Sequence, residues 1–141
     1  MYYWPFVTNG EIMTNLVFVY GTLKKGFGNH RLLEQAKFGG RGYIERVKML
    51  NLGAFPALIR GGTRAAEGEI YYINDHTLSA LDRLEGHPTF YERQEAKIYP
   101  FGDEFGEHLF AWCYFLSKDS QAHYEKLCPV IEEGVWNGRR A

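Results

Sequence analysis

The chain has 141 residues, of which 45% are hydrophobic, and its 16 Lys and Arg residues against 17 Asp and Glu residues leave a net charge of −1. This composition excludes a disordered chain, and the balance of charge offers no basic surface to nucleic acid or to an anionic membrane. We therefore expect neither of these as a partner. The length predicts a single domain over residues 1–141, with a core at about residues 16–116 and peripheral termini.

The cysteines and the N-terminal residues bear on the cellular compartment. Cys113 lies inside an apolar run and Cys128 lies near the tail, so the pair gives neither a disulfide framework nor a metal-binding spacing. Residues 1–15 lack the basic start and the long apolar stretch of a signal peptide. No stretch approaches the roughly 20 apolar residues of a membrane span. We expect a cytoplasmic protein without a membrane-spanning segment.

The first half of the chain alternates short apolar runs with turn residues, a pattern typical of short strands. Residues 29–37 instead predict a short helix, with Asn29 as its N-cap and Gly39-Gly40 as its end. Residues 53–56 read as a loop, because Pro56 disfavours helix at the residue before it. The strands expected in this half are residues 16–20, 41–50, 57–60 and 69–73.

The second half begins with a helix that starts from a cap at Asn74 or Asp75 and runs through Leu84. Leu78, Leu81 and Leu84 stack on one face of this helix, which we expect to pack inward. A polar turn at residues 102–106 then separates two long strands, and both faces of the second strand are apolar, which favours a central position. These strands are expected at residues 91–99 and 109–116.

Strands and helices that mix without strict βαβ alternation predict an α+β fold rather than a doubly wound sheet. Many strands in so short a chain are expected to curl, because closure removes exposed strand edges. The predicted architecture is a small mixed, barrel-like β-sheet with flanking helices.

The segment LVFVYGTLKKG, residues 16–26, predicts a strand that ends at Tyr20-Gly21-Thr22 without a hairpin signal such as Asn-Gly. One interpretation is that Gly21 only turns the chain. The other is that the turn directs backbone N–H groups towards a small anionic ligand. The segment by itself leaves both interpretations open.

Glu85 occupies the last turn of the predicted helix, where Gly86 is the expected residue after the C-terminus and Pro88 forbids continuation. A carboxylate in this place faces the negative end of the helix dipole, which is unfavourable and raises a carboxyl pKa. Two interpretations remain open, a solvated glutamate at a helix end and a general base. Asp82, one turn earlier, is interpreted as an exposed or structural carboxylate.

Other kinds of catalytic chemistry find less support. The five histidines show no H-E-x-x-H or comparable pairing, so we expect no metal site. Cys113 on a central strand is typical of a core residue, and no serine has the context of a nucleophile elbow. One candidate base and one glycine turn suit a reaction in which the substrate supplies its own nucleophile.

Three segments, in matching order along the chain, carry a family resemblance. They are VYGTLKKG…NH from Val19, GAFPAL at residues 53–58, and GEIYY…LDRLEGHPTFYER, which ends at Arg93. Together they resemble the γ-glutamylcyclotransferase-like family, which includes the γ-glutamylamine cyclotransferases, over about residues 17–116. Phe55 stands where tyrosine is common in that family. The resemblance implies a small mixed β-barrel with flanking helices, which is also what the sequence pattern predicts.

The resemblance also implies a site. The acid/base glutamate of the family corresponds to Glu85, and its substrate-cradling turn to Tyr20–Leu23. Gly21 would let the backbone approach closely, so that the amides after it grip the carboxylate or carbonyl of a γ-glutamyl group. The substrate-binding residues implied are Tyr20, Gly21, Thr22, Leu23, Tyr91 and Tyr114.

The implied reaction is intramolecular and needs no cofactor, because the nucleophile is already tethered to the substrate. The α-amine of a γ-glutamyl amine or γ-glutamyl amino acid attacks its own γ-carbonyl, closes 5-oxoproline and expels an amine, while Glu85 transfers the proton. One alternative is a catalytically idle small-molecule-binding protein of the same fold. Another is an amide hydrolase with water activated by Glu85. The leaving amine, the oligomeric state and the pathway do not follow from the sequence.

Overall fold

The computed structural model of the chain describes residues 6–8, 11–102 and 106–138. The strands in these ranges are β1 (Phe6–Thr8), β2 (Glu11–Met13), β3 (Asn15–Val19), β4 (Lys37–Asn51), β5 (Pro56–Arg60), β6 (Arg64–Ile73), β7 (Tyr91–Pro100) and β8 (Leu109–Leu116). The helical elements are the 3₁₀ helix η1 (His30–Leu33) and the α-helices α1 (Asp75–Glu85) and α2 (Lys118–Tyr124). No helix of the described ranges is long and apolar enough to cross a membrane.

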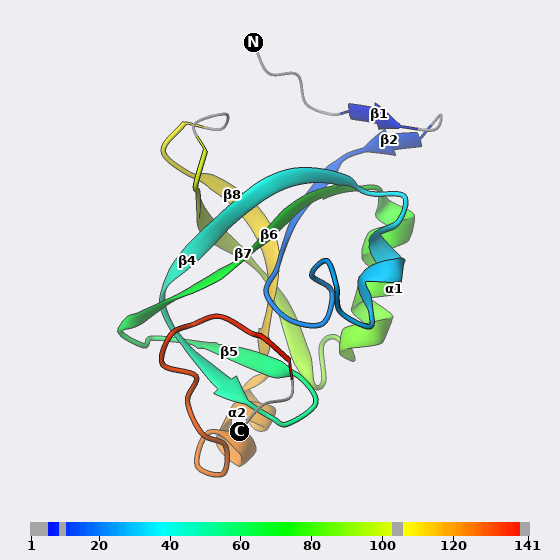
Figure 1. Cartoon of the computed structure of the whole chain (residues 1–141). Helices are drawn as coiled ribbons and strands as arrows, with labels where there is room; N and C mark the ends of the chain where they lie inside the picture. Colours follow the sequence, from blue (N-terminus) through cyan, green and yellow to red (C-terminus); the bar gives the residue numbers. More distant parts are fainter. Residues whose placement is uncertain (1–5, 9–10, 103–105, 139–141) are drawn as a thin grey trace.

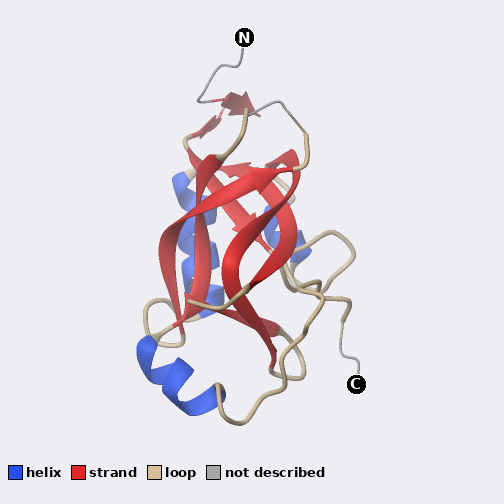
Figure 2. Ribbon diagram, turned by 90° about the vertical axis from the view of Figure 1, so that its left-hand side faces the viewer, coloured by secondary structure: helices blue, strands red, loops and turns tan. Residues whose placement is uncertain are grey.

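A mixed sheet closes into a barrel (Figure 1). Strand β3 pairs with β6, β6 with β4, β4 with β5 and β5 with β8, and the parallel pairing of Val17 with Trp112 joins β8 back to β3. Strand β7 adds to this ring by pairing with both β8 and β4. Figure 2 shows α1 along one side of the barrel, with the β1–β2 hairpin and α2 at opposite ends. The predicted α+β fold with a small barrel and flanking helices is confirmed.

Strand β8 is central, as its two apolar faces predicted, and it separates two hydrophobic clusters. Cys113 and Phe115 belong to the cluster enclosed by the barrel. Tyr114 and Leu116, which alternate with them, belong to a second cluster that includes Leu81 of α1. The outer face is buried at Tyr114 and Leu116, whereas Phe110 on the same face is 54% exposed. Residues 103–105 of the turn predicted before β8 lie outside the described residues.

Helix α1 has the predicted caps. The Asn74 side chain accepts a hydrogen bond from the N–H of Thr77 at 2.8 Å, so Asn74 is the N-cap. Gly86 ends the helix with φ 66°, a conformation that glycine adopts without strain. Leu81 is buried as predicted, but Leu84 is 42% exposed, so its predicted inward packing is wrong. Leu84 lines a cavity beside the end of the helix instead.

The short helix predicted at residues 29–37 forms only in part, as a 3₁₀ helix. The 3₁₀ helix η1 ends at Leu33, and Asn29 makes no side-chain cap hydrogen bond. Gly39-Gly40, predicted to end that helix, lie inside β4 instead. Gly40 has φ 110° at a shift in the pairing of β4 with β6, so the strand passes through the glycines as a bulge.

The C-terminal segment was predicted to be peripheral, and this is wrong for Trp136. This side chain is 2% exposed and belongs to the cluster inside the barrel. The strands contribute three alanines to that cluster, which leaves room for a large aromatic side chain from the tail. The Ile131 N–H also donates to the Met49 carbonyl of β4 at 2.8 Å. At the other end of the chain Met13 is 1% exposed, so the core extends beyond residues 16–116 on both sides.

Candidate active site

A cavity of about 300 Å³ lies beside the C-terminal end of α1. Its walls come from the end of β3 and the turn after it, Asn29, the start of β5 with the residue before it, the end of α1, the start of β7 and one residue of β8. This volume is at the small end of the range for ligand sites, roughly 300–1,000 Å³. Every site residue named from the sequence lines it, namely Tyr20, Gly21, Thr22, Leu23, Glu85, Tyr91 and Tyr114.

Glu85 brings a half-buried carboxyl group to the cavity. Within the described part of the chain it forms no ion pair and no hydrogen bond. Burial raises the pKa of Glu85 from its ordinary value of 4.5 to about 7. The group therefore carries and releases a proton near neutral pH, which is the property that a general acid/base requires.

The turn after β3, residues Tyr20–Leu23, lines the cavity, and we call it the glycine turn. The N–H groups of Gly21, Thr22 and Leu23 donate to no acceptor among the described residues. Two hydrogen bonds close the turn, from the Lys24 N–H to the Gly21 carbonyl and from the Asn29 N–H to the Thr22 carbonyl, each at 3.0 Å. The Asn29 side chain also donates to Thr22 Oγ1 at 2.8 Å. These bonds hold a set of free amides of the kind that binds anions.

The small size of Gly21 has a packing reason that the sequence did not predict. A Cβ atom on this residue would lie 2.9 Å from both Cδ and Cγ of Pro56, which is closer than real Cβ contacts. Glycine is therefore required by the packing of Pro56, the first residue of β5, against the glycine turn. The close approach of a ligand to Gly21 stays a prediction beside this packing constraint.

The three tyrosines of the cavity present rings rather than free hydroxyl groups. Tyr20 donates to the Tyr114 carbonyl at 2.7 Å, and Tyr91 donates to the Pro56 carbonyl at 2.6 Å. Tyr114 donates to Asp82 Oδ1 at 2.7 Å. Burial raises the pKa of each tyrosine well above 10, so the hydroxyl groups stay protonated. The tyrosines thus form the walls of the cavity and fix its shape.

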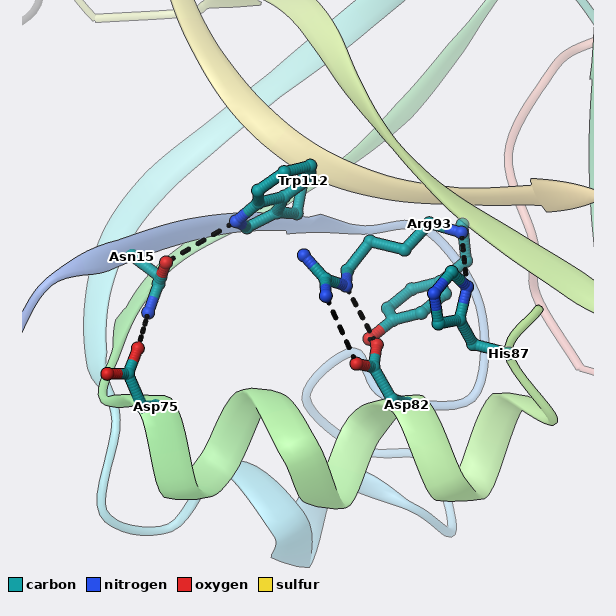
Figure 3. A network of polar contacts seen from close by, with 7 residues as sticks. Asn15, Asp75, Asp82, His87, Arg93 and Trp112 are labelled. Carbon is teal, nitrogen blue, oxygen red and sulfur yellow. Dashed lines mark hydrogen bonds and ion pairs between the residues drawn. The ribbon is translucent and has the colours of Figure 1, made fainter.

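Asp82 anchors the C-terminal half of α1 to the barrel (Figure 3). Its carboxylate accepts hydrogen bonds from Nε and Nη2 of Arg93 on β7, at 2.8 and 3.2 Å, besides the bond from Tyr114. The ring of His87, just after the helix, accepts from the Arg93 N–H at 2.9 Å. Asp82 is therefore a structural carboxylate, and its contacts determine where the last turn of the helix, with Glu85, lies.

A second set of contacts holds the beginning of α1 (Figure 3). The Asn15 side chain of β3 donates to Asp75 Oδ1 at 2.8 Å and accepts from Trp112 Nε1 of β8 at 3.4 Å. The Arg93 guanidinium lies 4.3 Å from the centre of the Trp112 ring and so connects this set to the Asp82 ion pair. Both ends of the helix are thus fixed on strands that line or border the cavity.

Sequence reasoning missed several residues that line the cavity, namely Asn29, Phe55, Pro56, Leu84 and Phe90. All five lie within segments that already carried the family resemblance, so the motifs contained this signal. Leu84 and Phe90 lie on either side of the helix end. Because the helical pattern predicted that Leu84 packs inward, it gave no indication that this residue would border a cavity.

The family assignment follows from a direct comparison. The family model described as gamma-glutamyl cyclotransferase, AIG2-like, matches residues 17–138. The chain belongs to this family. A Vibrio cholerae protein provisionally named as a gamma-glutamylcyclotransferase is 34% identical over 125 residues, which cover 88% of this chain and 96% of that protein. The human gamma-glutamylaminecyclotransferase is 34% identical over 95 residues, which cover 59% of this chain and 61% of the human protein.

Solved structures of the γ-glutamylcyclotransferase family share the fold of the chain. The crystal structure of a mouse AIG2-like protein superposes with a TM-score of 0.73 at 29% identity and covers 84% of this chain and 86% of the mouse chain. The solution structure of an Escherichia coli protein superposes with a TM-score of 0.62 at 29% identity and covers 86% of this chain and 96% of that chain. The barrel with its flanking helices is therefore the architecture of these relatives as well.

Proposed function

We propose that the protein is a cytoplasmic cyclotransferase that converts a γ-glutamyl amine or γ-glutamyl amino acid into 5-oxoproline and a free amine. One observation carries this proposal. The half-buried carboxyl group of Glu85, with a pKa of about 7, shares a small cavity with the free amides of the glycine turn. Family membership supports the same reaction class, and the human relative bears the name of a γ-glutamylamine cyclotransferase.

The proposed mechanism uses the substrate as its own nucleophile. The α-ammonium group, with a reference pKa of about 8, loses a proton to the Glu85 carboxylate. The free amine then forms a bond to the γ-carbonyl carbon, and the bond from that carbon to the departing nitrogen breaks. Glu85 returns its proton to this nitrogen, and the second proton that the cyclised nitrogen loses leaves with the same amine as an ammonium group, so the reaction consumes neither water nor a cofactor. Such proton transfer contributes about 10²–10⁴-fold in rate.

The amides of the glycine turn have two uses in this mechanism. They can hold the α-carboxylate of the γ-glutamyl group, or they can donate to the oxyanion that develops when the γ-carbonyl is attacked. A well-placed oxyanion donor contributes about 3 kcal/mol to transition-state stabilisation. Asn29 acts indirectly in this scheme, because its two bonds to Thr22 hold the amides in place.

The proposal is tested by product analysis on a panel of γ-glutamyl compounds that includes simple amines, amino acids and the ε-amine of lysine. Release of 5-oxoproline with a stoichiometric amount of amine supports the cyclotransferase. Release of glutamate instead would identify an amide hydrolase. Tight binding of panel members without any product would identify a catalytically idle binding protein.

A further inference from the structure

The exposed Leu84 side chain is the starting point, because an amphipathic helix does not usually present a large apolar residue at the mouth of a cavity. Two aromatic rings lie with it on the cavity wall, Phe55 and Phe90, whose ring centres are 6.0 Å apart in an edge-to-face arrangement. Phe90 packs beside Gly86, the residue that follows Glu85. We call Leu84, Phe55 and Phe90 the apolar rim.

The charged side chains around the cavity also indicate which ligand groups it can hold. Among the described lining residues, Glu85 is the only Asp, Glu, Lys, Arg or His side chain. Any carboxylate of a ligand must therefore be held by neutral donors, and the free donors identified are the amides of the glycine turn. This set can serve the α-carboxylate of a γ-glutamyl group. A second carboxylate would meet the apolar rim and Glu85, at a cost in desolvation and in like-charge repulsion.

We infer that the leaving group of the reaction is an amine with an apolar alkyl or arylalkyl substituent and without a carboxylate. This inference rests on the proposed cyclotransferase function and names its substrate class. The γ-glutamyl part binds at the glycine turn and Glu85, and the substituent on the departing nitrogen packs against the apolar rim. The ring walls of Tyr91 and Tyr114 continue the apolar surface, because their hydroxyl groups are already engaged by the protein.

A matched pair of substrates tests the inference. γ-Glutamyl-phenethylamine and γ-glutamyl-phenylalanine differ only in the carboxylate of the leaving group, and γ-glutamyl-methylamine lacks the apolar substituent. We expect kcat/KM for 5-oxoproline release from the phenethylamine compound to exceed both others by about 10-fold or more. Equal or faster release from the phenylalanine compound would overturn the inference while leaving the cyclotransferase function in place.

A charge placed on the rim should change this preference. Leu84→Lys is tolerated sterically, since the residue is 42% exposed, and it brings a cation to the position where the second carboxylate would lie. The preference for the phenethylamine compound over the phenylalanine compound should fall by about 5-fold or more. Leu127→Lys, at a residue that is 68% exposed and is not part of the cavity, makes the same change in charge and should leave the ratio unaltered. Equal effects of the two variants would overturn the role of the rim.

Failure of the proposed function has a separate signature, which is the absence of 5-oxoproline from all three compounds. In that case the preference between the phenethylamine and phenylalanine compounds is measured as their equilibrium binding to the Glu85→Gln protein, which cannot transfer the proton. Tighter binding of the phenethylamine compound by about 10-fold supports the apolar rim as a recognition surface. Equal binding, or no binding of either compound, overturns it.

Discussion

Glu85→Gln should stabilise the protein at neutral and alkaline pH and have little effect on stability in acid. The folded-state pKa of about 7 lies above the ordinary value of 4.5, so the folded protein binds a proton that the unfolded chain has already released between these values. Stability linked to Glu85 is therefore complete below about pH 4.5 and is lost as the pH rises through about 7. Glutamine removes this loss, because it cannot ionise.

The size of the effect follows from the same two pKa values. Since one pKa unit corresponds to about 1.4 kcal/mol, the rise from 4.5 to about 7 sets an upper limit of about 3.5 kcal/mol for the ionised group. The carboxyl group is only half-buried, so contact with water reduces the expected gain of Glu85→Gln to about 1–2 kcal/mol at about pH 8.

Urea unfolding at about pH 4.5, 6 and 8 measures this difference directly from the midpoints and slopes. Glu45→Gln, at an exposed position on β4, is the matched control and should show no comparable pH-dependent gain. A stability difference between wild type and Glu85→Gln that is the same at all three pH values would refute the reasoning. So would a variant that is less stable than wild type at about pH 8.

Three further substitutions test the packing around the cavity by urea unfolding. Asp82→Asn weakens the ion pair with Arg93 and should cost about 1–3 kcal/mol, and an unchanged midpoint would contradict the anchoring role of this carboxylate. Gly21→Ala should cost about 1–3 kcal/mol because its Cβ would lie 2.9 Å from the Pro56 ring, whereas wild-type stability would show that the loop yields freely. Tyr20→Phe removes the hydroxyl group that accepts a hydrogen bond from the buried Leu58 N–H at 3.1 Å, and it should cost about 1 kcal/mol or more. A smaller loss would mean that this N–H finds another partner.

Local patterns were sufficient for much of the fold. The caps of α1 could be predicted because Asn74 and Gly86 act through bonds within a few residues of themselves. The central place of β8 followed from its two apolar faces. By contrast, the passage of β4 through Gly40 depends on pairing with β6, which a single segment does not encode. The burial of Trp136 depends likewise on space left by distant strands.

The features of the candidate site also fall into two groups, those set by neighbouring residues and those set by distant contacts. The position of Glu85 at a helix end, and the glycine turn after a strand, are local features that the sequence already displayed. Their meeting in one cavity is a consequence of the barrel. The packing constraint on Gly21 comes from Pro56, far away in the sequence, so it could not be predicted from the turn alone. The exposure of Leu84 equally depends on where the helix ends relative to the cavity.

The central claim is that Glu85 transfers the proton in the formation of 5-oxoproline. The most direct measurement is 5-oxoproline release by wild type and by Glu85→Gln, from a γ-glutamyl compound that the wild type cyclises, together with the binding affinity of each protein for that compound. We expect kcat to fall by about 10²-fold or more while binding is retained, because glutamine keeps the size and hydrogen-bonding capacity of the side chain but accepts no proton. Full activity in Glu85→Gln would contradict the account.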